Sequence, residues 1–337
     1  MVKIGIVGCG YWGPNLIRNF FQAKDSELCA LCDTNEKRLK EMKETYFVKK
    51  SFTDYKSMLK DPEIEAVVIA TPPKTHYSLV QEALSSNKHV LVEKPLAFNT
   101  KESKDLVELA KTKKRILMVG HTFEFNPAVI KMKECITSGE LGKISYIYST
   151  RVNLGRVQEN INAIWSLAPH DVSIIHFILG SMPVRVRAYG SSHINKGIED
   201  VVFINLEFKD NVMAHIHVSW LDPSKIRKMT VVGSKKMLIY DDIDNEGKIK
   251  IYDKGVDRFS LEDSSYGVYQ TKLRAGDITM PKLRLYEPLR RECEHFIECI
   301  INNKNPDTDG ENGLRVVSVL EAAQMSLEQD GKVVEIK

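Results

Sequence analysis

A glycine-rich turn near the amino terminus carries the clearest chemical pattern in this sequence. Gly8, Gly10 and Gly13 stand at the spacing G-x-G-x-x-G, directly after an apolar run at residues 3–7. In such a turn the first glycine allows a tight bend, the second lets the backbone approach a pyrophosphate, and the third lets the next helix pack closely on the strand. The amino end of that helix attracts phosphates. The spacing therefore predicts a dinucleotide-binding turn.

A carboxylate follows this turn where it can distinguish two dinucleotides. Asp33 lies at the end of the second apolar run, where a carboxylate binds a ribose 2′-hydroxyl. A carboxylate repels a 2′-phosphate, so the sequence favours NAD over NADP, although the nearby Lys37 and Arg38 weaken the preference. The alternative is that Asp33 only caps the following helix. Tyr11 and Trp12 either wall the cofactor or seal the domain edge. The expected cofactor contacts here are Gly8, Gly10, Tyr11, Trp12, Gly13, Asp33, Thr34 and Arg38.

The elements that must position these residues change in character near residue 121. Up to that point short apolar runs alternate with amphipathic stretches, a pattern typical of βαβ units around a parallel sheet buried on both faces. We therefore expect an α/β fold, with a Rossmann domain at residues 1–121. The expected strands are residues 3–7, 28–32, 66–70, 89–92 and 116–120, and the expected helices are 15–22, 36–45, 55–60, 76–86 and 103–111.

Longer alternating runs beyond residue 121 predict a second, α+β domain at residues 122–337 with a mostly antiparallel, open-faced sheet. We expect it to bind substrate and to mediate oligomerisation. Residues 254–282 show little periodicity and are expected to form an extended loop. The expected strands are 144–152, 184–189, 201–208, 212–219, 228–232, 237–241 and 248–252, and the expected helices are 169–179, 287–302 and 313–327.

One strand of this second sheet suggests a subunit contact. Val212, Ala214, Ile216 and Val218 alternate along it and are expected on the open face. A large exposed apolar patch usually marks an interface, so we expect a homodimer or homotetramer.

The composition excludes several classes of protein. The 337 residues include 48 Lys and Arg against 45 Asp and Glu, a net charge of +3, so nucleic acid is not an expected partner. No apolar run reaches about 18 residues and no signal peptide is apparent, so we expect a cytoplasmic protein that does not enter membranes. Cys29 and Cys32 are interpreted as strand packing rather than a redox or zinc half-motif. His215 and His217 lack a third ligand, so no metal is expected.

Two further segments narrow the function. Val92-Glu93-Lys94-Pro95 ends a predicted strand, and Ala70-Thr71-Pro72-Pro73 precedes His76 at the start of a helix. With the glycine turn and the antiparallel second domain, the whole chain resembles the glucose–fructose oxidoreductase and inositol dehydrogenase (Gfo/Idh/MocA) family of NAD(P)-dependent sugar oxidoreductases. The resemblance implies that Lys94 contacts the nicotinamide ribose and the substrate hydroxyl. A lysine at the carboxyl end of a strand also faces the crevice of an open α/β sheet. Thr71, Pro72, His76 and Glu93 are further implied cofactor contacts.

The segment at residues 162–174 resembles the histidine motif of that family, and His170 matches the catalytic histidine. Pro169 suits the first turn of a helix, so His170 is expected near a helix amino end, where the dipole keeps an imidazole neutral. The family often carries Asp, sometimes Asn, four residues before this histidine, whereas this chain has Ser166. Whether Ser166 or Asp171 replaces the acidic partner stays open.

Residues 10–15, 165–174 and 286–310 are similar to the nucleotide-sugar branch of the family, especially UDP-N-acetylglucosamine 3-dehydrogenases. The resemblance implies oxidation of the C3 hydroxyl to a UDP-3-keto sugar. It also implies that a PLP-dependent aminotransferase makes a 3-amino sugar from this product for lipid A or other surface glycans. We expect His170 to take the hydroxyl proton while Lys94 hydrogen-bonds the same oxygen. Other expected substrate contacts are Arg151, Arg156, Asn160, Asn162 and Asp171. The alternatives are that the first four lie in a solvated loop and that Asp171 caps the helix.

Three alternatives remain at this point. The chain could oxidise another sugar or inositol, it could be an NAD-assisted glycosidase that re-reduces its sugar, or it could bind NAD without catalysis. The sequence does not specify the sugar, the direction of the reaction or the number of subunits.

Overall fold

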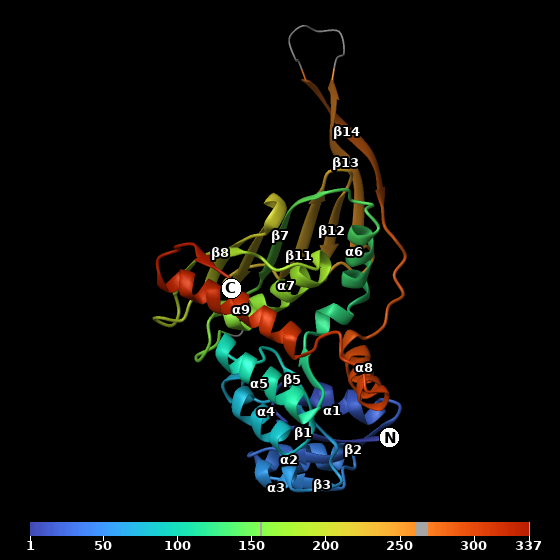
Figure 1. Cartoon of the computed structure of the whole chain (residues 1–337), viewed down its shortest axis with the longest axis vertical. Coiled ribbons are helices and arrows are strands. Elements are labelled where there is room, and N and C mark those ends of the chain that lie inside the picture. Colours follow the sequence, from blue (N-terminus) through green and yellow to red (C-terminus); the bar gives the residue numbers. More distant parts are fainter. Residues whose placement is uncertain (156, 261–268, 337) are drawn as a thin grey trace. The chain divides into compact units, whose positions relative to one another are not determined.

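The computed structural model describes residues 1–155, 157–260 and 269–336, which divide into two compact units (Figure 1). The first unit contains Met1–Asn126 and Tyr286–Glu321, and the second contains Pro127–Leu285 and Ala322–Lys337. The sequence pattern placed one boundary after residue 121 and did not indicate that a late segment returns to the first unit.

A six-stranded parallel sheet forms the centre of the first unit. The strand order is β3-β2-β1-β4-β5-β6. From β1 the chain adds strands first on one side and then, from β4 on, on the other side. The boundary between β1 and β4 is therefore the switch point where dinucleotides bind in open α/β sheets. The predicted Rossmann fold is confirmed, and the short β3 was not predicted. The strands are β1 (Val2–Val7), β2 (Ser26–Cys32), β3 (Lys50–Phe52), β4 (Ala66–Ile69), β5 (His89–Glu93) and β6 (Leu117–Gly120).

Helices cover this sheet because their apolar residues recur at helical spacing. In α1, Leu16, Ile17 and Phe20 are fully buried, and the Phe20 ring lies edge-on to Phe296 of α8, with ring centroids 6.3 Å apart. This packing explains why the late segment joins the first unit. The helices are α1 (Gly13–Gln22), α2 (Glu36–Thr45), α3 (Tyr55–Leu59), α4 (His76–Ser85), α5 (Thr100–Lys113) and α8 (Pro288–Asn302), with short turns η1 (Pro73–Thr75) and η2 (Thr122–Phe125). Helix α9 (Gly310–Glu328) contributes to both units.

The second unit is built on a sheet that has nine strands in the described part of the chain. The order is β14-β13-β12-β11-β7-β10-β9-β8-β15, and every neighbouring pair except β7 and β10 is antiparallel, as predicted. Helix α6 (Pro127–Thr137) was not predicted. The other elements are β7 (Ile144–Val152), α7 (Ala163–Leu179), β8 (Arg185–Ser191), β9 (Val201–Glu207), η3 (Lys209–Asn211), β10 (Met213–Ser219), β11 (Ile226–Gly233), β12 (Met237–Asp241), β13 (Ile249–Ser260), β14 (Tyr269–Thr279) and β15 (Val334–Glu335).

The prediction of an extended loop at residues 254–282 is wrong for the residues that the structure describes. Strands β13 and β14 pair over most of this stretch as a long hairpin (Figure 1), while residues 261–268 lie outside the described part. A two-stranded ribbon with solvent on both faces needs no alternation of apolar and polar residues. The period that reveals other strands is therefore missing here.

The prediction of which face of β10 is open is also wrong. Ala214, Ile216 and Val218 are buried within the unit, on the face that α7 covers, and the opposite face carries His215 and His217. The ring of Phe203 stacks on both histidines, with centroids 6.0 and 4.4 Å away. Val212, just before the strand, is half-buried. The oligomeric state stays a prediction. Within the described residues no helix is long and apolar enough to cross a membrane.

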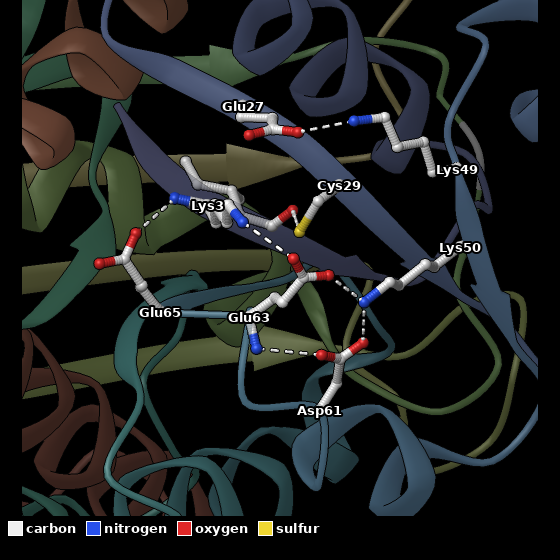
Figure 2. Close-up of polar contacts among 9 residues, drawn as sticks. Lys3, Glu27, Cys29, Lys49, Lys50, Asp61, Glu63 and Glu65 are labelled. Carbon is white, nitrogen blue, oxygen red and sulfur yellow. Dashed lines mark hydrogen bonds and ion pairs between the residues drawn. The ribbon is translucent and has the colours of Figure 1, made fainter.

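Charged residues gather over the amino ends of the parallel strands (Figure 2). Lys3 Nζ lies 3.0 Å from Glu63, Lys50 Nζ lies 2.7 Å from Asp61 and also pairs with Glu63, and Lys49 pairs with Glu27 at 3.2 Å. The Cys29 thiol bonds the Ile4 carbonyl, is buried, and has its pKa raised by burial to about 11. Because dinucleotides bind at the carboxyl ends of such strands, this network belongs to the opposite edge of the sheet.

Candidate functional site

The three glycines of the turn after β1 differ in what surrounds them. Gly8 has φ +97°, and a Cβ there would lie 2.6 Å from the Ala70 carbonyl oxygen. A Cβ on Gly13 would lie 2.0 Å from the carbonyl oxygen of Gly8, so α1 starts in backbone contact with the turn. Among the residues that the structure describes, nothing lies within 4 Å of a Cβ on Gly10, and no side chain caps the amino end of α1. The turn therefore fits a pyrophosphate, with backbone exposed at Gly10 and at the helix end.

Asp33 is held beside this turn by backbone donors. Its Oδ2 accepts from the Cys9 N–H at 2.6 Å and its Oδ1 from the Asn35 N–H at 2.7 Å. The cap of α2 is Asn35, whose side chain accepts from the Arg38 N–H at 3.1 Å, so the alternative that Asp33 caps this helix is wrong. The half-buried Asp33 carboxylate is placed to bind a ribose hydroxyl, which fits NAD.

Arg38 also lies against the glycine turn. Its Nε donates to the Cys9 carbonyl at 3.2 Å, its Nη2 to the Gly10 carbonyl at 3.4 Å, and its Nη1 to Glu41 at 2.8 Å. Thr34 and Tyr11 are exposed nearby. Their contacts with a cofactor stay predictions.

His76 ties together the loops that follow β4 and β5. It has no exposed surface, and its ring nitrogens lie 2.7 Å from the Pro95 carbonyl oxygen and 3.0 Å from that of Thr71. Burial lowers the pKa of this histidine. The expected direct contact of His76 with the cofactor is corrected to a supporting one, because a fully buried ring cannot touch a ligand. Thr71 is half-buried and Pro72 is exposed at the same edge.

The Glu93-Lys94-Pro95 segment stands at the carboxyl end of β5. Glu93 is the last residue of the strand, and the half-buried Lys94 follows it and precedes a cis bond to Pro95. The indole Nε1 of Trp12 donates to Glu93 Oε1 at 2.5 Å, which joins the glycine turn to this segment. The predicted roles of Glu93 and Lys94 remain compatible with these positions and stay predictions.

In the second unit, α7 begins earlier than the sequence pattern suggested. Asn162 caps it by accepting from the Trp165 N–H at 3.4 Å, so the helix starts at Ala163 and Pro169 lies inside it. His170 is therefore two turns into the helix, and the predicted influence of a helix amino end on its imidazole is wrong. Asn162 also donates to Glu199 at 2.8 Å and to Gln324 at 2.9 Å, which uses both amide hydrogens. Its predicted donation to a sugar is corrected to capping.

Asp171 does not face a substrate in this unit. Its side chain is 3% exposed and accepts from Arg151 Nε at 2.5 Å, from Arg151 Nη2 at 3.3 Å, and from the Ser149 hydroxyl at 2.5 Å. The predicted substrate contacts of Asp171 and Arg151 are thus corrected: α7 and β7 are joined by a buried ion pair, because a carboxylate turned toward the sheet needs a counter-charge.

The remaining predicted substrate residues are less constrained. Ser166 and His170 are both half-buried and stand one turn apart, so they share a face of α7. Asn160 is exposed before the helix. Arg156 lies outside the described residues. Ser166, not Asp171, is therefore the residue on the same helix face as His170.

The sequence analysis missed a group of buried carboxyls near the ends of β5 and β6. Glu292 of α8 is 0% exposed and Glu124 of η2 is 4% exposed. The sequence pattern could have revealed Glu292. In α8 the residues Leu289, Glu292, Cys293 and Phe296 have the spacing of the buried face of a helix, and Glu292 is the acidic residue among them.

Comparisons with known proteins agree with this architecture. Residues 2–121 match the model described as an oxidoreductase family with an NAD-binding Rossmann fold, and residues 129–239 match the GFO/IDH/MocA C-terminal domain. Among named proteins, a myo-inositol 2-dehydrogenase of Thermotoga maritima is 26% identical and covers 98% of both chains.

Solved structures show the same fold. The UDP-N-acetylglucosamine 3-dehydrogenase of Acidithiobacillus ferrooxidans has a TM-score of 0.81 at 21% identity and covers 98% of both chains. The scyllo-inositol dehydrogenase of Lactobacillus casei has a TM-score of 0.81 at 19% identity, over 100% of this chain and 99% of the other.

Proposed function

Because this chain belongs to the Gfo/Idh/MocA family of oxidoreductases, we propose that it oxidises the C3 hydroxyl of a nucleotide-activated amino sugar, UDP-N-acetylglucosamine. At the level of the family, it is an NAD-dependent oxidoreductase that acts on CH–OH groups. The identity of the sugar is the more specific part of the proposal. It is supported by the resemblance of residues 10–15, 165–174 and 286–310 to nucleotide-sugar dehydrogenases.

The observation that carries the proposed chemistry is the arrangement at the carboxyl edge of the parallel sheet. An open glycine turn, the oriented Asp33 carboxylate and Lys94 after β5 all stand at this edge. When bound, NAD supplies the acceptor for the C3 hydride. We propose that Lys94 hydrogen-bonds the reacting oxygen and that His170 takes its proton. Ser166, on the same helix face, is proposed to orient His170 where relatives often carry an acidic residue.

The product of this reaction suggests a partner enzyme. A UDP-3-keto sugar presents the carbonyl that a PLP-dependent aminotransferase requires. We therefore propose that such an aminotransferase acts directly after this chain.

A second candidate function is inositol oxidation. It is favoured by the full-length relative from Thermotoga maritima, whose name specifies myo-inositol. Both candidates require the same class of hydride transfer and differ in whether the substrate carries a nucleotide.

The deciding experiment offers the purified protein NAD with UDP-N-acetylglucosamine, myo-inositol, scyllo-inositol or an aryl glycoside. A glutamate-dependent 3-aminotransferase is added to draw off any 3-keto sugar, and mass spectrometry identifies the products. We expect a UDP-3-amino sugar that is absent when either enzyme is omitted. NADH formation with an inositol alone would favour the second candidate, and cleavage of the aryl glycoside without net NADH would favour an NAD-assisted glycosidase.

The proposed base can be tested within one helix. His170→Ala should lower turnover about 100-fold or more, the usual contribution of general base catalysis, while NADH binding stays unchanged. His176→Ala, near the end of α7, is the matched control and should keep full turnover. Unchanged turnover in His170→Ala would remove this residue from the mechanism.

A further inference from the structure

The carboxyl of Glu93 lies beside a glycine of the neighbouring strand and occupies the space that a larger residue would fill there. Glu93 pairs with Gly120, the last residue of β6, and a Cβ on Gly120 would lie 3.2 Å from the Glu93 carboxyl carbon and both its oxygens. Trp12 Nε1 donates to Oε1 at 2.5 Å, and the Lys94 N–H donates to Oε2 at 3.3 Å. The carboxyl is therefore fixed between the glycine turn and the lysine of the proposed site.

A second carboxyl stands behind it. The Thr122 hydroxyl, two residues after Gly120, donates to Glu292 Oε2 at 2.7 Å, so both carboxyls lie against the segment that ends β6. Glu292 is fully buried, and its Oε1 has no hydrogen-bond partner among the residues that the structure describes. Such a group is costly to ionise.

Further charged groups surround the pair. Glu124 of η2 is buried, with Asn312 Nδ2 of α9 at 3.2 and 3.3 Å from its oxygens, and the buried His121 adjoins Gly120. Cys293 follows Glu292 on α8, and Lys94 supplies a cation. Three acidic side chains thus gather here, where no two can ionise together without cost.

The electrostatics assign different states to the two carboxyls. Burial raises the pKa of Glu93 to about 7, against the lowering effects of Lys94 and of the Trp12 hydrogen bond. Burial, and then the charge of Glu93, raise the pKa of Glu292 well above its ordinary value. The neutral form of Glu292 is therefore favoured, and Glu93 is the carboxyl that changes charge near neutral pH.

This carboxyl lies in the half of the sheet that serves the nicotinamide. In open α/β sheets the dinucleotide crosses the switch point, here between β1 and β4. The turn after β1 is placed to bind the pyrophosphate, and the carboxylate after β2 is placed to bind the adenosine ribose. The nicotinamide half of the dinucleotide is therefore expected at the ends of β4, β5 and β6. The nicotinamide ring carries a positive charge in NAD⁺ that hydride addition removes.

We propose that Glu93 is the group by which this chain distinguishes the two redox states of its cofactor, being ionised when NAD⁺ is bound and protonated when NADH is bound. The uncharged Glu292 side chain packs behind the Glu93 carboxyl and keeps water away from it. Binding of NAD⁺ to the protonated protein then releases one proton from Glu93 to solvent, and binding of NADH to the ionised protein takes one proton up. This proposal requires NAD binding but not the proposed sugar.

The test measures binding in the absence of any sugar. NADH affinity is read from NADH fluorescence and NAD⁺ affinity from competition, at intervals between about pH 5.5 and pH 8.5. Below the Glu93 midpoint near pH 7, the Kd of NAD⁺ should fall by up to about tenfold per pH unit and then level off, because one proton is exchanged. The Kd of NADH should stay constant below this midpoint and rise by up to about tenfold per pH unit above it, because binding then takes up one proton.

Two neutral replacements assign the effect. Glu93→Gln keeps an oxygen for Trp12 and should abolish the pH dependence of NAD⁺ affinity. Glu292→Gln resembles the protonated carboxyl and should retain it. Equal pH dependence for NAD⁺ and NADH in the unaltered protein, or a dependence that survives Glu93→Gln, would overturn the proposal. If Glu93→Gln fails to fold, an indicator dye decides on the unaltered protein: nearly one proton released per NAD⁺ near pH 6 supports the proposal, and none refutes it.

Discussion

The buried ion pair between Arg151 and Asp171 should be one of the most sensitive points of the second unit. The two side chains are 7% and 3% exposed, and the guanidinium donates to the carboxylate at 2.5 and 3.3 Å. Removing the Arg151 guanidinium leaves the Asp171 charge with the Ser149 hydroxyl at 2.5 Å as its remaining described donor. An uncompensated buried charge costs about 3–5 kcal/mol, so Arg151→Met should lower the free energy of unfolding of this unit by that amount.

A double-mutant cycle tests whether the two buried charges depend on each other. Asp171→Asn should cost a similar amount, whereas the double variant Arg151→Met with Asp171→Leu removes both charges and should return to within about 1–2 kcal/mol of the parent. The difference between the double variant and the sum of the single variants gives the coupling energy.

The assay can be confined to the second unit. The chain has three tryptophans, and Trp12 is the one in the first unit. In a Trp12→Phe background, urea unfolding followed by fluorescence therefore reports on Trp165 and Trp220. Single variants that each cost less than about 1 kcal/mol would show that the pair is solvated, and the assignment of Asp171 to a structural role would then be wrong.

Two further predictions concern the first unit. Gly13→Ala should lower the thermal midpoint and abolish NADH binding measured by fluorescence, because its Cβ would lie 2.0 Å from the Gly8 carbonyl oxygen. Gly10→Ala, whose Cβ would meet nothing within 4 Å among the described residues, should leave the thermal midpoint unchanged. Equal thermal midpoints for both variants would contradict this difference. Glu292→Gln should gain stability over the parent as pH rises above about 4.5, because the pKa of Glu292 is raised in the folded state, which then keeps a proton that the unfolded chain releases. Thermal midpoints of both proteins from pH 4.5 to 8 check the sign, and a constant difference would refute it.

Local sequence determined the nucleotide-binding half of this protein. The glycine spacing, Asp33 and the short apolar runs of the parallel sheet each depend on neighbouring residues, and the structure has the expected elements at those places. Such features are readable because turn geometry and the alternation of strand and helix are properties of short segments.

Tertiary structure decided how the polar residues are used. Pro169 predicted the start of α7, but Asn162 caps the helix seven residues earlier and donates to Glu199 and Gln324. An aspartate can bind a sugar hydroxyl or an arginine, and its residue type alone does not distinguish the two roles. The structure shows that Asp171 is buried against Arg151 of β7.

The same limit applies to the buried carboxyls near the ends of β5 and β6. Thr122 and Glu292 are 170 positions apart, and only the packing of α8 on the first unit brings them into a hydrogen bond. Sequence spacing reports which residues lie near one another along a helix or strand. The protonation and partners of a buried charge depend instead on every element that surrounds it, and that surrounding exists only once the chain is folded.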